Sequence, residues 1–347
     1  MTTSLSDDEV RRTRVAAQLL HRPGRRPAVS DLVGRLLAVQ AQDIAAAPLA
    51  LRVRSRGLTA ADVATAREDR SVVRAWGPRG TLHLMAVDDL PLLLTFVSTA
   101  GSVRRLRQEG VEGSPEDLAR VCERALAGQG PLTKAEVGER LARLGVPAQG
   151  QGIVHVLFQA AARGAVVLGP DRSSRPTYVH AGDWLGHVPR PAPDPAELAR
   201  RYLRTRAPAG PEDLAAWSGL ALGAARSAWA AIADELTEVE HAGRPLWRLR
   251  RGAARPAEVP VALLPAFDEY LLGWRDRTLI ISERHARRMF RGGGMIPATV
   301  VVDGRIVGSW RRDRAGGVET TLLEPVDADL LAVESGDLDR FFRFDQE

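Results

Sequence analysis

One order of elements recurs along this chain: a helix, a turn, a second helix and two short strands. It is clearest in residues 131–182, where Thr133 and Glu136 form the capping box that opens a helix. A Gly-Val-Pro turn and a second helical stretch, GIVHVLFQAAARG, follow, and then two strand-like runs, AVVLG and PTYVH. This is the order of a winged helix, a variant of the helix-turn-helix, so it constrains the fold strongly.

A second copy of this order covers residues 205–250. Pro211 opens its first helix, a turn lies between Gly219 and Gly223, and the second helix reads LGAARSAWAAIADE. The runs LTEVEH and PLWRLR then form a hairpin around Gly243.

A looser third copy covers residues 28–86. We expect Ser30 to cap a helix that runs to about Gln40, with further helices over 44–54 and 60–67. The runs VVRAWG and TLHLMA would be its two strands. Three such units at intervals of about 75 residues predict a tandem array.

The remainder of the chain, residues 256–347, has a different pattern. Its runs VALLPAF, TLIIS, TVVVDGRIVGSWRR and VETTLLEP are strand-like, and a short helix is expected near 327–343. Asp303-Gly304 is a strong hairpin signal between two of these strands. The proline-rich stretch 189–195 is the clearest linker candidate.

We therefore predict an α+β fold of tandem winged-helix (helix-turn-helix) units with a small C-terminal β-rich domain. The first unit, with an N-terminal extension, is assigned to residues 1–112, the second to 113–190 and the third to 191–255. The β-rich domain is assigned to 256–347. A chain of 347 residues with 45% hydrophobic and 26% charged side chains is long enough and apolar enough for several compact units.

Positive charge in this chain is almost all arginine. Lys and Arg number 48 against 43 Asp and Glu, which gives a net charge of +5, and Lys134 is the only lysine. Arginine suits phosphate recognition because its planar guanidinium donates two parallel hydrogen bonds. The mild positive excess favours a polyanionic partner. The preference for arginine over lysine is also what a GC-rich genome produces.

Several classes of chemistry are excluded by what the sequence lacks. Cys122 is the only cysteine, so an internal disulfide, a cysteine zinc site and an iron–sulfur cluster are excluded. The seven histidines show no ligand spacing, and no phosphate loop, GxGxxG, HExxH or GxSxG motif occurs. We therefore expect no metal and no cofactor. The polar N-terminus and the lack of an apolar run of about 20 residues favour a cytoplasmic protein without a membrane segment, and we expect a monomer.

Clusters of arginines are candidate contacts to nucleic-acid phosphates. A single cluster is usually a solvated face, but clusters spread over winged-helix units could converge on one groove. Arg248, Arg250 and Arg251 lie at or just beyond a predicted wing, where contacts to a DNA backbone or minor groove are expected. The clusters are Arg11, Arg12 and Arg14; Arg104, Arg105 and Arg107; Arg200, Arg201, Arg204 and Arg206; Arg248, Arg250 and Arg251; Arg284, Arg287, Arg288 and Arg291; and Arg311, Arg312 and Arg314.

The run VQAQD, residues 39–43, places two glutamines at the expected end of the first helix. Gln40 and Gln42 do not share a helical face, so they can point into one cavity only if the helix stops there. On spacing alone they could equally be two surface amides. Asp43 beside them is typical of a helix cap.

Three segments together resemble the AlkZ/YcaQ group of winged-helix DNA glycosylases. They are LLAVQAQDIAAAPLALRVR (36–54), RGTLHL (79–84) and LLPAFDEYLLGWRDR (263–277). The resemblance implies tandem winged helices and a β-rich C-terminal domain around a C-shaped, basic DNA cleft. Family members excise N-alkylated purines, and some unhook interstrand crosslinks made by DNA-alkylating natural products, which confers self-resistance.

The resemblance also implies which residues act. The family's catalytic motif, Gln-Φ-Gln or Gln-Φ-Asp with Φ apolar, maps onto Gln40 and Gln42, with Ala41 at Φ in place of the usual bulkier residue. An alkylated purine is already cationic, so the two amides need only hold and align a water. No lysine lies near the pair, which argues against a Schiff-base lyase and for a monofunctional glycosylase. The resemblance implies that such an enzyme needs no cofactor and acts on double-stranded DNA at the nucleoid.

Further residues receive roles through the same resemblance. Arg79 would contact phosphate and His83 would line the cleft, although His83 could also be a satisfied histidine at a strand end. The segments 267–270 and 275–277 favour structural roles at the junction to the β-rich domain, with Arg275 and Arg277 kept as DNA-contact candidates. The alternative function is a non-catalytic winged-helix DNA-binding protein, a transcriptional regulator or a lesion-shielding factor.

Overall fold

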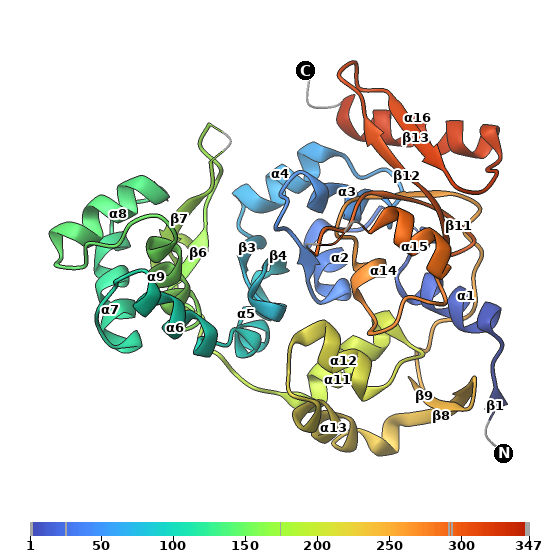
Figure 1. The fold of residues 1–347 in the computed structure, drawn as a ribbon, viewed down its shortest axis with the longest axis horizontal. Coiled ribbons are helices and arrows are strands. Elements are labelled where there is room, and N and C mark those ends of the chain that lie inside the picture. The colour runs from blue at the N-terminus through green and yellow to red at the C-terminus, as the bar shows by residue number, and fades with distance from the viewer. Residues whose placement is uncertain (1–2, 25, 174, 291, 293, 344–347) are drawn as a thin grey trace. The chain divides into compact units, whose positions relative to one another are not determined.

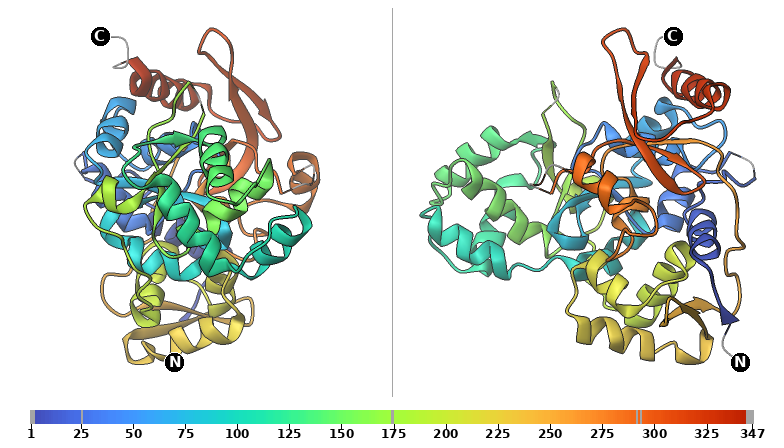
Figure 2. Two further views of the ribbon diagram at one scale, coloured as in Figure 1. Left: turned by 90° about the vertical axis from the view of Figure 1, so that its left-hand side faces the viewer. Right: turned by 45° about the vertical axis from the view of Figure 1, so that its right-hand side comes forward.

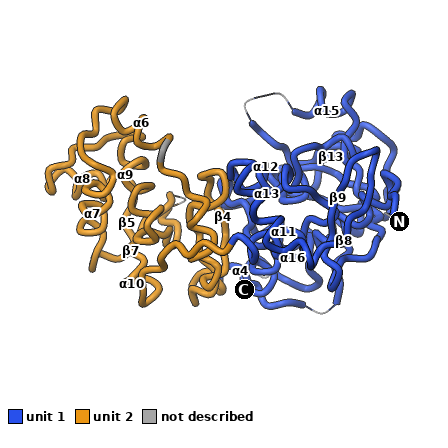
Figure 3. Tube along the Cα trace, turned by 90° about the horizontal axis from the view of Figure 1, so that it is seen from below, with its two compact units in different colours: residues 1–64, 195–347 blue, residues 65–194 orange. Residues whose placement is uncertain are grey.

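The protein forms two compact units in a computed structural model that describes residues 3–24, 26–173, 175–290, 292 and 294–343. Unit 1 contains Met1–Ala64 and Pro195–Glu347, and unit 2 contains Thr65–Asp194 (Figure 3). The expected proline-rich linker ends at the boundary between Asp194 and Pro195. The finer division into four parts stays a prediction, and the observed boundary after Ala64 falls inside its first part.

Unit 2 contains the predicted winged helix of residues 131–182. The capping box is present, because the Thr133 hydroxyl accepts the Glu136 backbone N–H while the Glu136 carboxylate accepts the Thr133 backbone N–H. The order helix, turn, helix and two antiparallel strands is confirmed. The elements are α8 (Lys134–Arg143), α9 (Gln151–Ala161), β6 (Val166–Leu168) and β7 (Thr177–His180), with α7 (Pro115–Leu126) packed against α9.

A single sheet joins the two pairs of wing strands in unit 2. Strand β3 (Val72–Trp76) pairs with β4 (Leu82–Ala86) and also, through Arg74 opposite Leu168, with β6. The strand order in this unit is β4-β3-β6-β7-β5, where β5 is Leu132–Thr133. Its remaining α-helices are α5 (Leu90–Leu93), α6 (Ala100–Gln108) and α10 (Ala181–Leu185).

The copy at 205–250 lies in unit 1 and is confirmed in its element order. Gly219 ends α12 in the left-handed conformation, and Ala242 and Gly243 form the hairpin turn. A short parallel pairing adds β1 (Thr3–Ser4) to β8. The elements are α11 (Pro195–Arg206), α12 (Pro211–Ser218), α13 (Leu222–Ala230), β8 (Leu236–His241) and β9 (Arg244–Leu249) (Figure 1).

The N-terminal part of the chain supplies helices to unit 1. Ser6 and Glu9 form a capping box that opens α1. The elements are α1 (Asp7–Ala17), α2 (Val29–Leu36), β2 (Val39–Gln40) and α3 (Ala46–Arg52), followed by α4 (Ala60–Glu68).

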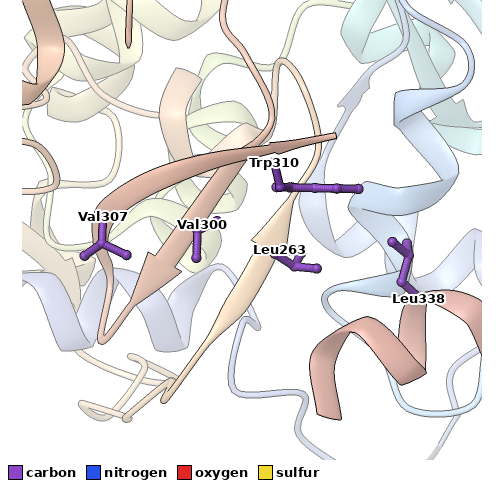
Figure 4. Packing of buried hydrophobic residues seen from close by; sticks show 5 residues of the cluster. All are labelled: Leu263, Val300, Val307, Trp310 and Leu338. Carbon is purple, nitrogen blue, oxygen red and sulfur yellow. The ribbon is translucent and has the colours of Figure 1, made fainter. Parts of the chain in front are cut away.

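The C-terminal region forms the predicted β-rich part. Asp303 and Gly304 have φ of 44° and 77°, as a two-residue hairpin turn requires. Helix α16 (Ala328–Arg343) lies beside the sheet, and Leu338 joins its core with Leu263, Val300, Val307 and Trp310 (Figures 2 and 4). The antiparallel sheet has the order β10 (Ala262–Leu264), β11 (Thr299–Val302), β12 (Arg305–Arg312) and β13 (Val318–Leu322).

The prediction of a strand at TLIIS, residues 278–282, is wrong. Ile280 and Ile281 are buried, but both backbone N–H groups donate to the Arg277 carbonyl, which makes a turn. The turn leads into α15 (Glu283–Met289). The strand propensity of this run did not decide its structure. Its apolar side chains are buried without a strand, because the turn supplies hydrogen bonds to the backbone N–H groups.

Within the described ranges, no helix is both long enough and apolar enough to cross a membrane.

Candidate active site

The first predicted helix ends earlier than its pattern suggested, so its predicted extension to Gln40 is wrong. Helix α2 ends at Leu36, and Leu37 takes φ of 73°. The run from Leu36 to Val39 is 0–1% exposed at every position, whereas a surface helix buries only one face. The chain therefore enters the core extended and forms β2. Ser30 is not the cap either, since Ala28 precedes the helix without a side-chain bond.

Gln40 and Gln42 flank a fully buried Ala41. Gln40 is 8% exposed, at the end of β2, while Gln42 lies exposed on the following bend. The prediction that Asp43 caps a helix is wrong, because Ala45 precedes α3 without a side-chain bond. Asp43 instead accepts the Ala45 backbone N–H on its Oδ1 at 3.0 Å, in the turn that leads into α3. The pair thus lies on a strand and a bend, and not at a helix terminus.

The main chain of Gln40 is held by a buried carboxylate. Glu269, the first residue of α14 (Glu269–Leu272), is fully buried, and its Oε1 accepts the Gln40 backbone N–H at 3.0 Å. Its Oε2 accepts Nη2 of Arg206 at 2.6 Å and Nε1 of Trp217 at 3.1 Å. Three N–H donors from β2, α11 and α12 therefore converge on one carboxylate.

Arg206 lies in the core and not in a solvated cluster, which corrects its grouping with Arg200, Arg201 and Arg204 of α11. Its side chain is 0% exposed, and its guanidinium carbon lies 4.4 Å from the Trp217 ring centre. Nη1 of Arg206 donates to the Leu36 carbonyl at 3.3 Å, at the end of α2. Arg206 therefore links the carboxylate of Glu269 to the turn that precedes Gln40.

A second buried ion pair lies beside the first. Asp268 caps α14 by accepting the Tyr270 backbone N–H at 2.8 Å, and it also receives both terminal nitrogens of Arg54. Arg54 further donates to Gln18 at 2.9 Å. The structural role predicted for the segment 267–270 is confirmed.

Arg79 and His83 lie in unit 2, on the turn between β3 and β4 and on β4. Arg79 is half-buried in the left-handed conformation, with φ of 59°. His83 is fully buried, and its Nδ1 lies 3.0 Å from the Thr81 carbonyl oxygen. A contact of either residue with DNA stays a prediction, and the burial of His83 does not favour it.

The wing arginines of unit 1 differ in their surroundings. Arg248 is half-buried on β9, and Arg250 is exposed but donates its Nε to the Leu236 carbonyl at 2.9 Å. Arg251 is exposed and lines a cleft of about 530 Å³. The other residues that line this arginine cleft are Gly34, Arg35, Glu197, Arg201, Arg204 and Gly252. The lining therefore contains four arginines and one acidic residue.

Arg275 and Arg277 lie near a cleft of mixed charge. Arg275 is exposed and lines a cavity of about 910 Å³ that also holds Glu212, Asp213 and Asp276. Arg277 donates its Nε to the Leu271 carbonyl at 2.7 Å, and burial lowers the pKa of its guanidinium. Their DNA contacts stay predictions, and the arginine cleft is the more cationic surface.

Sequence reasoning missed the connection between Glu269 and Gln40. One signal was available, because two acidic residues interrupt the apolar run LLPAFDEYLL. Adjacent acids in a buried run require buried cationic partners. The identity of those partners depends on long-range packing, so the run alone could not name Arg54 and Arg206.

Comparisons with known proteins agree with this architecture. Residues 33–341 match the family described as DNA glycosylase AlkZ-like. A protein of Streptomyces sahachiroi named interstrand DNA cross-link repair glycosylase is 29% identical over 309 residues, which cover 83% of each chain. The solved structure of the Streptomyces sahachiroi DNA glycosylase AlkZ matches with a TM-score of 0.84 and 28% identity, over 98% of this chain and 97% of that one. The chain therefore belongs to the AlkZ-like family of DNA glycosylases, enzymes that hydrolyse the N-glycosidic bond between a base and its deoxyribose.

Proposed function

We propose that this enzyme excises purines alkylated at N7 or N3 from double-stranded DNA, with Gln40 and Gln42 positioning the hydrolytic water. The observation that carries the proposal is the fixed Gln40 peptide, bonded at 3.0 Å to a buried carboxylate, with the exposed Gln42 two residues later. A fixed main chain at Gln40, followed by the accessible Gln42, suits the holding of a single water.

The chemistry fits two amides because the substrate is already activated. An alkylated purine carries a positive charge, so the bond from C1′ to the base nitrogen breaks toward an oxocarbenium-like state with little acid assistance. A glutamine amide does not ionise near neutral pH and cannot be a general base. Its carbonyl can accept a hydrogen bond from the water and align it with C1′, and its dipole favours the developing positive charge.

The arginine cleft supports the DNA-binding part of the proposal. Arg35, Arg201, Arg204 and Arg251 line it, from α2, α11 and the segment after β9. Arg201 also donates to the Gly34 carbonyl, and Arg204 lies 3.7 Å from Glu197, so the cleft is partly preorganised. Guanidinium groups at this density suit backbone phosphates, which fix the register of the duplex and carry no sequence information.

Unhooking of interstrand crosslinks is proposed on the name of the Streptomyces sahachiroi relative. A crosslinked purine is an N-alkylated purine whose substituent continues into the opposite strand, so the same bond is cleaved and only the space around the adduct differs.

The test uses the purified protein with duplex DNA that contains either N7-methylguanine or a nitrogen-mustard crosslink. Free base should be released, and hot alkali should cleave the strand at the abasic site that remains. DNA that shifts in a native gel without any release of free base would contradict the proposal and indicate a DNA-binding protein without this activity.

A further inference from the structure

Glu269 contacts the proposed catalytic machinery at the main chain of Gln40. It stands 229 positions away in the sequence, and its Oε1 lies 3.0 Å from the Gln40 backbone nitrogen. At 0% exposure, the carboxylate is out of reach of water and DNA, so it is not placed to act as an acid, a base or a nucleophile. Its contact instead concerns where the Gln40 peptide lies.

We propose that Glu269 is a positioning residue, which fixes the Gln40 peptide and so the direction in which the Gln40 amide meets the hydrolytic water. The inference rests on the proposed role of Gln40. It adds a residue of α14, 229 positions along the chain from Gln40, to the proposed active site near β2.

The carboxylate is itself held rigidly enough for this task. Arg206 and Trp217 both donate to Oε2, at 2.6 and 3.1 Å, which leaves Oε1 directed at Gln40. Hydrogen bonds to a buried ionic pair are shorter and stronger than neutral ones. Arg206 also bonds the Leu36 carbonyl, so both sides of the segment between α2 and Gln40 are anchored to the same ion pair.

The chain contains a matched buried carboxylate that holds a different peptide. Glu334 of α16 is 4% exposed, and its Oε1 accepts the Leu263 backbone N–H at 3.2 Å and Nη2 of Arg52 at 2.8 Å. Like Glu269, it is a buried carboxylate that pairs with a buried arginine and accepts a backbone N–H, but Arg22 also donates to it at 2.7 Å and the peptide it anchors belongs to β10. Effects of losing a buried ion pair can therefore be separated from effects on Gln40.

The experiment compares two double variants that both remove the ion pair. Glu269→Gln with Arg206→Met keeps an oxygen acceptor for the Gln40 N–H, whereas Glu269→Met with Arg206→Met removes it. Single-turnover release of N7-methylguanine should be about 100-fold slower in the variant without the acceptor, because a displacement of about 1 Å costs that much. DNA affinity and the urea midpoint of the two should agree.

The control variant is Glu334→Met with Arg52→Met. It should lose stability as the other pair does and keep the release rate within about threefold of the wild type at a temperature where it is folded. Equal rates in the two Glu269 variants would overturn the proposal, as would a control that loses as much activity as the variant without the acceptor.

A second readout does not depend on activity. In ¹⁵N-glutamine-labelled protein, the Gln40 amide proton should be protected from exchange in the wild type and in the double variant that carries Glu269→Gln. It should exchange at least about tenfold faster in the double variant that carries Glu269→Met. Equal exchange in both variants would overturn the positioning role even in an active enzyme. A wild type that releases no base, but shows this pattern, would refute the proposed function and leave the positioning of the peptide standing.

Discussion

Arg54 and Asp268 form a bidentate ion pair in which both N–O distances are 2.7 Å and neither side chain is exposed. The pair joins Arg54, two residues after the end of α3, to the cap of α14. Because α14 begins with Glu269, the two acids are adjacent. Glu269 accepts the backbone N–H of Gln40, and Asp268 pairs with Arg54, which lies beyond the helix α3 that follows Gln40. Neighbouring buried charges thus support both the stability of unit 1 and the geometry of the proposed active site.

Asp268→Asn is expected to destabilise unit 1 strongly. It leaves Arg54 buried without its counter-charge, and breaking a buried pair in this way costs about 3–5 kcal/mol. The free energy of unfolding from urea titration checks this. Glu283→Gln, which breaks an ion pair whose members are 77% and 81% exposed, should change it by less than about 1 kcal/mol. Similar losses in both variants would contradict the structural role of the buried pair.

The arginine cleft predicts a change in salt dependence. Arg204→Ala with Arg251→Ala should lower the slope of log K against log salt by about 0.9 for each phosphate that the variant no longer neutralises. DNA affinity should be measured on undamaged duplex between low and moderate salt.

The control for this prediction removes two charges from elsewhere. Arg120 and Arg143 are both 70% exposed, on α7 and α8, and their replacement by alanine should leave the slope nearly unchanged. An unchanged slope in the cleft variant, or an equal fall in the control, would place the phosphates outside the cleft.

Glu136 predicts a pH dependence of stability in unit 2. The Thr133 backbone N–H, the Thr133 hydroxyl and Arg172 lower the pKa of Glu136 from 4.5 to about 2. A folded-state pKa below the unfolded value means that the stabilisation is complete above pH 4.5 and is lost as the pH falls toward 2. The stability advantage of the wild type over Glu136→Gln should therefore shrink across that window. A difference that stays constant down to about pH 2 would contradict the assignment.

Cys122 offers a probe of the opening of unit 2. It is fully buried on α7, and burial raises the pKa of its thiol to about 12. The native protein should therefore react with a thiol reagent at about pH 8 only as fast as the unit opens, and addition of urea should accelerate labelling. Rapid stoichiometric labelling in buffer would contradict the packing of α7.

Local signals in the sequence predicted much of the fold. The capping box at Thr133 and Glu136, the Pro211 start and the Asp303-Gly304 turn act over a few residues, and each is found where the pattern indicated. The end of α2 was not predictable in this way. Leu36 to Val39 read equally well as a helix, and only their simultaneous burial selects the extended chain.

The buried arginines show the limit of reading charge from a sequence. Arg206 was grouped with candidate DNA contacts, yet it is 0% exposed because a carboxylate from a distant segment pairs with it. Arg52 and Arg54 are buried in the same way. The glutamine pair could be found from its family context. Its support by Glu269 required the structure, since the two residues meet only through the fold of unit 1.

The most direct test of the proposed catalysis measures single-turnover release of N7-methylguanine by the wild type and by Gln40→Ala with Gln42→Ala, at saturating protein and with DNA affinity measured in parallel. We predict that the double variant binds DNA with affinity within about threefold of the wild type and releases base at least about 100-fold more slowly. Release at the wild-type rate from the double variant would contradict the assignment of the water-positioning role to these two amides.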